Sequence, residues 1–117
     1  MINENYVINY SKEKILIQIL KQSNSYYIYI GNKNMFFNNL ILSIPFQNNI
    51  DSNKNIVTKE LIEDENEVNN YGKIISEFLS KKINKPIFIS FNLNDELIKT
   101  NPFIIESLQE NLFKLLN

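Results

Sequence analysis

The sequence predicts an α+β fold with about six mainly antiparallel β-strands and two amphipathic helices, at about 65–84 and 101–116. In the first half of the chain, short apolar runs rich in Ile, Val and Tyr are typical of strands. In the second half, apolar residues recur at three- and four-residue steps, which is the spacing of a helix face. A further apolar run separates the two helical stretches. The 117 residues are expected to form a single domain, 1–117.

Five strands are expected before the first helix. The run 15–20 is apolar on both faces except at Gln18, so a strand covered on both sides or a helix segment would fit, and its β-branched content favours the strand. Another run closes at Gly31, where a positive φ is cheap. Pro45 indicates a strand end or an edge position. The expected strands cover 6–10, 15–20, 26–30, 40–44 and 56–61.

The first helix has one apolar stripe and a charge order that suits its dipole. Acids at 63–67 precede or open it, and lysines at 81–85 lie at its end. Asn84 is expected to be its C-cap, and Pro86 prevents its continuation. Gly72 costs a helix about 1 kcal/mol relative to Ala, so we expect close packing against the sheet at this position.

The last helix follows a sixth strand and a polar turn. The strand at 87–93 is apolar on both faces at most positions, which indicates a central place in the sheet. The segment around Asp95 is interpreted as a polar turn. We expect the last helix to begin with Asn101 as N-cap and Pro102 at the first helical position. Its wide apolar stripe consists of Phe103, Ile104, Ile105, Leu108, Leu112, Leu115 and Leu116.

The composition argues against an enzyme. The chain has no His and no Cys, which removes the commonest general base, the thiol nucleophile and the usual zinc ligands. Its two glycines, Gly31 and Gly72, are too far apart to form a phosphate-binding loop. The acids at 63–67 lack the spacing and the glycine of a calcium loop, so a solvated helix start is the favoured interpretation. We expect no catalytic residues, no cofactor and no metal.

The charge and hydropathy of the chain also restrict its partners and location. Nucleic acid is disfavoured because the net charge is −1, there is no Arg, and the lysines are dispersed among acids. No apolar run approaches the roughly 18 residues of a membrane span. We expect a cytoplasmic protein, and a nuclear location also fits. Ile, Asn and Lys are abundant and Ala is absent, as in a product of an AT-rich genome, so the Asn-rich stretch 48–55 is interpreted as loop filler whose role stays open.

Two groups of apolar residues are candidates for a protein interface. Phe36 and Phe37 lie between two expected strands, where their side chains are either packed into the core or exposed for contact with a partner. On the terminal helix the candidates are Phe103, Leu108 and Leu112, although a stripe that simply covers the sheet fits equally well. The strand aromatics are assigned to the core in preference to an interface or a base-stacking platform. These aromatics are Tyr26, Tyr27, Tyr29, Phe88 and Phe91.

One segment resembles a known family. Residues 82–93, Lys-Ile-Asn-Lys-Pro-Ile-Phe-Ile-Ser-Phe-Asn-Leu, resemble the part of the proteasome assembly chaperone 4 family in which the long helix gives way to a core strand. There the pattern is approximately a basic residue, x, Asn-Lys, x, and an aliphatic-aromatic strand ending in Ser-aromatic-Asn-Leu. The strand at 27–31, the segment Asn39-Leu40-Ile41-Leu42 and the strand exit Asn9-Tyr10-Ser11 follow the family's order. The Asn-rich stretch near 48–55 and the loss of every Arg depart from it.

The resemblance implies a non-enzymatic chaperone for assembly of the 20S proteasome core particle. Proteins of this family pair with proteasome assembly chaperone 3, and the pair binds alpha subunits, notably the fifth, to promote alpha-ring formation. For the isolated chain, a weak homodimer or an aggregation-prone monomer is expected. The alternative is a generic small α+β adaptor domain for protein–protein interaction, which would bind a non-proteasomal complex. Any family contact that depends on Arg does not carry over.

Overall fold

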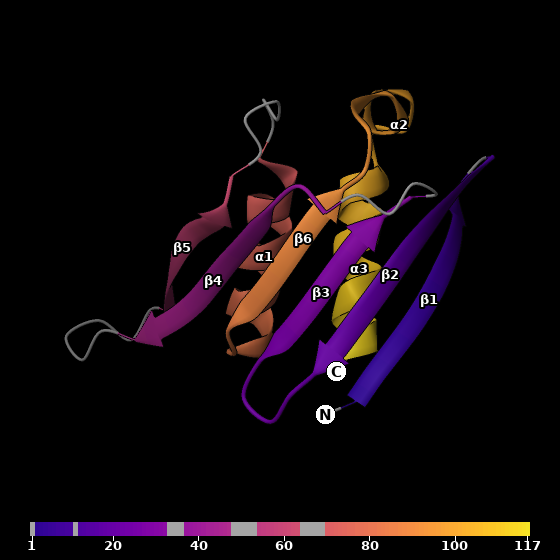
Figure 1. Ribbon diagram of the computed structural model, residues 1–117. Helices are drawn as coiled ribbons and strands as arrows, with labels where there is room; N and C mark the ends of the chain where they lie inside the picture. Colours follow the sequence, from indigo (N-terminus) through magenta and orange to yellow (C-terminus); the bar gives the residue numbers. More distant parts are fainter. Residues whose placement is uncertain (1, 11, 33–36, 48–53, 64–69) are drawn as a thin grey trace.

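The computed structural model describes residues 2–10, 12–32, 37–47, 54–63 and 70–117. They form a six-stranded sheet with two long helices against one face (Figure 1). The elements are β1 (Ile2–Tyr10), β2 (Glu13–Lys21), β3 (Tyr26–Gly31), β4 (Leu40–Gln47), β5 (Lys54–Ile62), α1 (Tyr71–Ile83), β6 (Ile87–Asn92), α2 (Asp95–Thr100) and α3 (Ile104–Leu116). None of these helices is long and apolar enough to cross a membrane.

The strands are arranged in the order β1-β2-β3-β6-β4-β5. Four of the five neighbouring pairs are antiparallel, and β3 with β6 is the parallel pair. The parallel pair arises because the chain leaves β5, crosses one face of the sheet as α1 and returns as β6 between β3 and β4. The predicted α+β class, the mainly antiparallel sheet and the central position of the sixth strand are therefore confirmed.

The run at 15–20 forms a strand, as its β-branched residues predict. In β2 the side chains of Ile15, Ile17 and Ile19 are buried beneath the helices, while Leu16 and Leu20 are half-buried on the other face. This alternation is that of a pleated strand, in which successive side chains point to opposite faces. The main core lies between the sheet and the helices. It includes Ile15, Ile17, Ile19, Ile28, Ile30, Ile75, Leu79, Ile87, Ile89, Ile104, Leu108 and Leu112.

Gly72 lets α1 pack closely against the sheet, as the sequence predicts. A Cβ atom at this position would lie 2.8 Å from Cδ1 of Ile41 and 3.2 Å from Cβ of Phe91. Ile41 belongs to β4 and Phe91 to β6, so the glycine lies over two neighbouring strands. The missing side chain therefore offsets the unfavourable helix propensity of glycine, because the helix can approach both strands.

Replacing Gly72 by Val is expected to destabilise the fold by about 1–3 kcal/mol, since the added methyl groups would overpack this contact. Urea unfolding followed by circular dichroism measures the change. Lys73→Val is the matched control, because Lys73 is exposed one position further along α1 and its replacement introduces the same β-branched residue. Equal loss of stability in the two variants would show that helix propensity, and not close packing, accounts for the effect.

A buried chain of hydroxyl groups joins α1 to the β4–β5 hairpin. The hydroxyl of Ser43 is hydrogen-bonded to those of Ser76, at 2.8 Å, and Thr58, at 2.9 Å. Thr58 donates to Oε1 of Glu77, at 2.8 Å. Ser43 and Thr58 are directly opposite in the β4–β5 pair, so both face the helix. Because every member has a partner, these polar groups can be buried at the helix–sheet contact.

The end of α1 agrees with the prediction, and the described helix starts later in the chain than the predicted residue 65. Asn84 adopts the left-handed conformation, with φ 63° and ψ 42°, and its N–H donates to the carbonyl of Ser80 at 2.8 Å. It is therefore the C-cap. Among the described residues, the helix begins at Tyr71, directly after Asn70. Residues 64–69, which include the rest of the predicted first turn, lie outside the described residues.

The region before the last helix differs from the prediction. Where the sequence predicts a polar turn, the structure has the helix α2. Asn94 caps the start of this helix, since its side chain accepts a hydrogen bond from the N–H of Leu97 at 2.8 Å. Leu97 and Ile98 are buried, which holds the short helix in place. Asn101 is consequently the C-cap of α2 and not the N-cap of the last helix. The expected start at Pro102 is wrong, since α3 begins at Ile104.

At Gly31 the structure differs from the sequence-based expectation, and at Pro45 it confirms the edge position and not the strand end. Gly31 has no positive φ and continues β3, where it pairs with Leu16 of β2. The strand β4 passes through Pro45 to Gln47. Beyond Ser43, however, β4 pairs with β5 and no longer with β6. Pro45 therefore lies at a local sheet edge, where its missing N–H leaves no bond unmade.

A small polar cluster ties the N-terminal strand to the end of α3. Lys21 lies 3.3 Å from the carboxylate of Glu4 and donates to the carbonyl of Leu115 at 3.0 Å. Tyr6 donates a hydrogen bond to the same carboxylate. The hydrogen bond from Tyr6, with smaller contributions from Lys21, lowers the pKa of Glu4. The same hydrogen bond raises the pKa of Tyr6. The cluster connects β1, β2 and α3 at one side of the sheet.

Candidate protein-binding face of the sheet

One face of the sheet carries none of the helices of the described residues. Figure 1 shows α1 and α3 behind the strands, and no element of the described chain lies in front of them. We call this side the open face. It is defined by the side chains that alternate with the buried core residues along the strands. Its apolar members are Val7, Leu16, Leu20, Tyr27, Tyr29, Leu40, Leu42, Ile44, Phe46, Val57 and Phe88.

The strand register places an apolar row across the middle of the open face. Leu20 is directly opposite Tyr27, which is opposite Phe88, which is opposite Leu42. Residues directly opposite each other in neighbouring strands point to the same face, so these four side chains follow one another across β2, β3, β6 and β4. The row ends at Lys59 of β5, a charged residue on the edge strand.

The centre of this row is an aromatic pair. The rings of Tyr27 and Phe88 stack with centroids 5.3 Å apart and an angle of 14° between their planes. Both side chains are half-buried, so each keeps surface for a further contact. Paired aromatic rings of this kind are rigid and apolar, and residues of this type commonly anchor protein interfaces. We therefore place the centre of the candidate site at Tyr27 and Phe88.

Tyr29 extends the apolar surface beyond the central row. Its ring lies over Gly31, because a Cβ atom on that glycine would be only 2.6 Å from the Tyr29 hydroxyl oxygen. Burial raises the pKa of Tyr29 above its ordinary value of 10.0. The glycine thus leaves room for a tyrosine ring to lie flat against the sheet.

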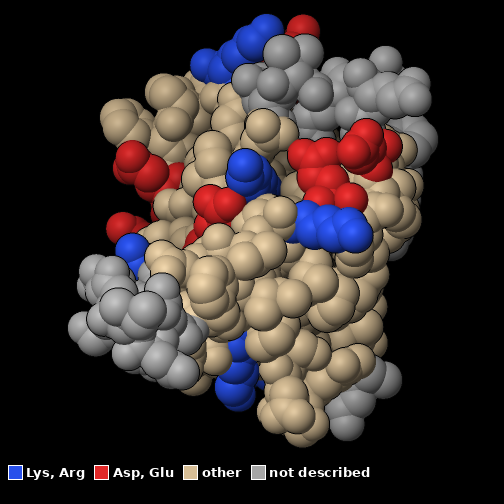
Figure 2. All heavy atoms as spheres, turned by 90° about the vertical axis from the view of Figure 1, so that its left-hand side faces the viewer, with Lys and Arg blue, Asp and Glu red and all other residues tan. Residues whose placement is uncertain are grey.

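A second apolar area lies where β4 meets β5. Ile44 and Val57 are directly opposite each other and both are exposed, and Phe46 is the next residue of β4 on the same face. Figure 2 shows the side of the molecule that carries β5, where charged side chains gather in the upper part and a broad uncharged area lies below them. A monomer rarely exposes an apolar area that continues over several strands, so the open face has the character of a protein interface.

The candidate interface residues from the sequence fall into different places. Phe36 lies outside the described residues, and Phe37 is exposed just before β4. Phe103 is 70% exposed in the turn between α2 and α3. Leu108 and Leu112 are only 2% and 0% exposed. Placing these two leucines in an interface is therefore incorrect for this chain, because the sheet and α1 already cover them.

The strand aromatics divide between the two faces. Tyr26 and Phe91 are buried in the core, as predicted. Tyr27, Tyr29 and Phe88 instead lie on the open face, so their assignment to the core is wrong. The sequence carries a signal for this outcome, since strands that are apolar on both faces need a cover on both sides. Here α1 and α3 supply only one cover.

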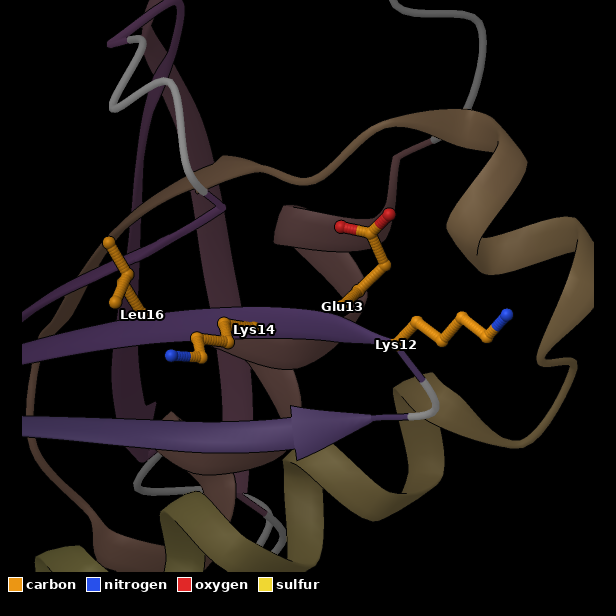
Figure 3. Close-up of a pocket in the computed structure, with 4 residues that line it drawn as sticks. All are labelled: Lys12, Glu13, Lys14 and Leu16. Atoms are coloured by element: carbon orange, nitrogen blue, oxygen red, sulfur yellow. The ribbon is translucent and has the colours of Figure 1, made fainter.

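Within the part of the chain that the structure describes, the charged side chains do not gather into a metal site. A cavity of about 330 Å³ lies at the start of β2, and its described lining consists of Lys12, Glu13, Lys14 and Leu16. Figure 3 shows the Glu13 carboxylate and the Lys14 ammonium group pointing apart, so these side chains do not converge on a ligand. Among the described residues no group of three or more Asp or Glu side chains could hold a metal ion. Of the acids at 63–67, only Glu63 is described, and it is exposed.

Comparison with known proteins gives one family and one similar fold. A family model described as "Proteasome assembly chaperone 4" matches residues 14–93, which is more than half of the chain and runs from β2 to just beyond β6. A solved structure described as "Crystal Structure of a Novel Chaperone Complex for Yeast 20S Proteasome Assembly" has a TM-score of 0.64 and 13% sequence identity. The match covers 98% of this chain and 97% of that chain, and at this identity it shows a shared fold. Curated protein sequences give no match.

Proposed function

This chain belongs to the proteasome assembly chaperone 4 family, and we propose that it is a non-enzymatic chaperone for assembly of the 20S proteasome. In this proposal it pairs with proteasome assembly chaperone 3, and the pair binds alpha subunits, notably the fifth, during formation of the alpha ring. The pair would act in the cytosol or the nucleus. The single observation that carries the proposal is the open face, which is apolar across four neighbouring strands and has no cover within the described chain.

In this proposal the partner chaperone binds the open face. Two sheets that pack face to face lie about 10 Å apart, with the side chains of their inner faces interdigitating. The stacked rings of Tyr27 and Phe88 would then lie at the centre of the contact, where buried aromatic residues contribute most. Lys59, at the end of the central row, would lie at the rim, where charged side chains stay hydrated.

A chaperone of this kind works by differential binding and needs no bond making or breaking. A pair that binds one arrangement of neighbouring alpha subunits more tightly than the others shifts assembly toward that arrangement. In this proposal the contact with a subunit is reversible, because the chaperones have to leave the subunit once it is part of the ring. Protein interfaces that bury little surface are commonly weak and reversible.

Co-expression with proteasome assembly chaperone 3 of the same organism tests the proposal. We expect a stable one-to-one pair in size-exclusion chromatography with light scattering, and higher solubility than that of either chain alone, because pairing covers the open face. The purified pair is expected to retain an alpha subunit at low salt.

Affinity purification from the native organism provides the second arm of this test. Recovery of alpha subunits with both chaperones supports the proposal. Recovery of a non-proteasomal complex, with no alpha subunit at permissive salt, would favour the generic adaptor domain and contradict the chaperone role.

A further inference from the structure

We infer that the cleft between α1 and α3 is a second protein-binding site, which takes an acidic segment carrying one large apolar side chain. The cleft has a volume of about 260 Å³. It is lined by Phe78 and Lys82 of α1 and by Glu110, Phe113 and Lys114 of α3. The inference concerns the helical layer and is independent of what covers the open face.

The apolar part of the cleft is suited to a single anchoring side chain. Phe78 and Phe113 are half-buried, and both pack against the core between helices and sheet. The cleft is smaller than the roughly 300–1,000 Å³ typical of pockets for small molecules and cofactors. A shallow cleft of this size, in which two aromatic side chains are supported by the core, suits contact with one apolar side chain of a partner.

The charges around the cleft select an acidic partner. Lys82 and Lys114 are exposed at its margin, and the ammonium group of Lys82 lies 5.9 Å from the centroid of the Phe78 ring. Within the described chain neither lysine has a carboxylate at ion-pair distance, although Glu110 lines the same cleft. Two cations against one anion leave a net positive margin around an apolar centre. Complementary charge favours a partner segment with acidic residues next to its apolar anchor.

The helix dipoles explain part of the lysine pattern but not all of it. Lysines are favourable in the last turn of a helix, and Lys82 and Lys114 lie in the last turns of α1 and α3. The dipole does not require that both of these lysines line the same apolar cleft. Exposed lysines beside two half-buried aromatic rings combine charge and apolar surface in one site, which suits a segment with both acidic and apolar side chains.

The position of the cleft allows two partners at the same time. The helices lie on the side of the sheet opposite the open face, so a chain bound to the open face leaves the helical layer accessible (Figure 1). If the proposed pairing holds, the cleft becomes a surface through which the pair can bind a third protein. If the pairing fails, binding of an acidic segment in the cleft is still expected.

Fluorescence anisotropy with defined peptides tests the inference on the full chain. The probe is a fluorescein-labelled peptide with one Leu between Asp and Glu residues, and two matched peptides replace either the Leu by Ser or the acids by Lys. We expect the acidic Leu peptide to bind, and each matched peptide to bind at least about tenfold more weakly, because one lacks the anchor and the other the complementary charge.

A charge-reversal variant tests whether the acidic peptide binds at the cleft between α1 and α3. The double variant Lys82→Glu and Lys114→Glu is expected to weaken binding of the acidic peptide by about tenfold or more. Lys73→Glu is the matched control, since Lys73 is exposed on α1 but does not line the cleft, and it should bind as the unchanged protein does. Absence of binding, equal binding of the Ser peptide, or unchanged binding in the double variant would each overturn the inference. Pairing measured on the same variants is expected to be unaffected, which separates this result from the proposed function.

Discussion

Replacing Ile44 by Asp is expected to abolish pairing with the partner chaperone while the chain remains folded. Ile44 is 41% exposed on the open face, opposite Val57, so an aspartate at this position stays hydrated in the unpaired chain. Pairing would move its carboxylate out of water into the contact, beside the apolar side chain of Val57. Burial of an unpaired charge costs several kcal/mol, and about 2.8 kcal/mol already corresponds to a hundredfold loss of affinity.

Ile74→Asp is the matched control for this variant. Ile74 is 49% exposed on α1, so the same substitution at similar exposure lies on the opposite layer of the molecule. Co-purification with the partner and analytical ultracentrifugation measure pairing, and circular dichroism checks that both variants are folded. Of the two variants, only Ile44→Asp is expected to fail to co-purify with the partner chaperone. Normal pairing of Ile44→Asp, or equal loss in the two variants, would contradict an interface on the open face.

The strands of the sheet could be predicted because strand periodicity is a property of the local sequence. What covers each face of the sheet depends on tertiary and quaternary contacts, which the local sequence does not show. The runs at 15–20 and 87–93 are apolar on both faces, and both form interior strands of the sheet, β2 and β6. The same pattern arises whether the second face is covered by the chain's own helices or by another protein. The sequence alone therefore placed Tyr27 and Phe88 in the core, although they lie on the uncovered side.

The terminal helix illustrates the opposite ambiguity. Leu108 and Leu112 are part of a wide apolar stripe, and such a stripe fits either a core or an interface. The structure decides for the core because α3 lies behind the sheet beside α1. The start of the terminal helix is predicted too early because Asn101 followed by Pro102 fits a helix start. Burial of Leu97, a tertiary contact that is not visible in the local sequence, instead holds a separate helix, α2, which is capped by Asn94 and ends at Asn101.

Asn39 shows how composition can hide a structural residue. In a chain with abundant asparagine, a single Asn next to a strand is not distinctive, although the Asn39-Leu40-Ile41-Leu42 segment fits the pattern of the family. In the structure Asn39 is only 3% exposed. Its amide group donates to the carbonyl of Phe91 at 2.7 Å and accepts from the N–H of Phe91 at 2.8 Å. One side chain thus replaces a strand residue as the hydrogen-bonding partner of β6, just before β4 begins.

Asn39→Ala is expected to destabilise the fold by about 2–5 kcal/mol, because it leaves the N–H and the carbonyl of Phe91 without this partner in a buried position. Chemical unfolding followed by circular dichroism measures the loss. Asn38→Ala is the control, since Asn38 is exposed and uses its backbone N–H, which the substitution keeps, to donate to Asn92. Asn39→Asp separates the two bonds: an ionised carboxylate still accepts from the N–H but repels the carbonyl, so its destabilisation should decrease at low pH, where a protonated carboxyl can donate again. A stability of Asn39→Ala within about 0.5 kcal/mol of the unchanged protein would contradict this role, because that is the range of ordinary surface substitutions.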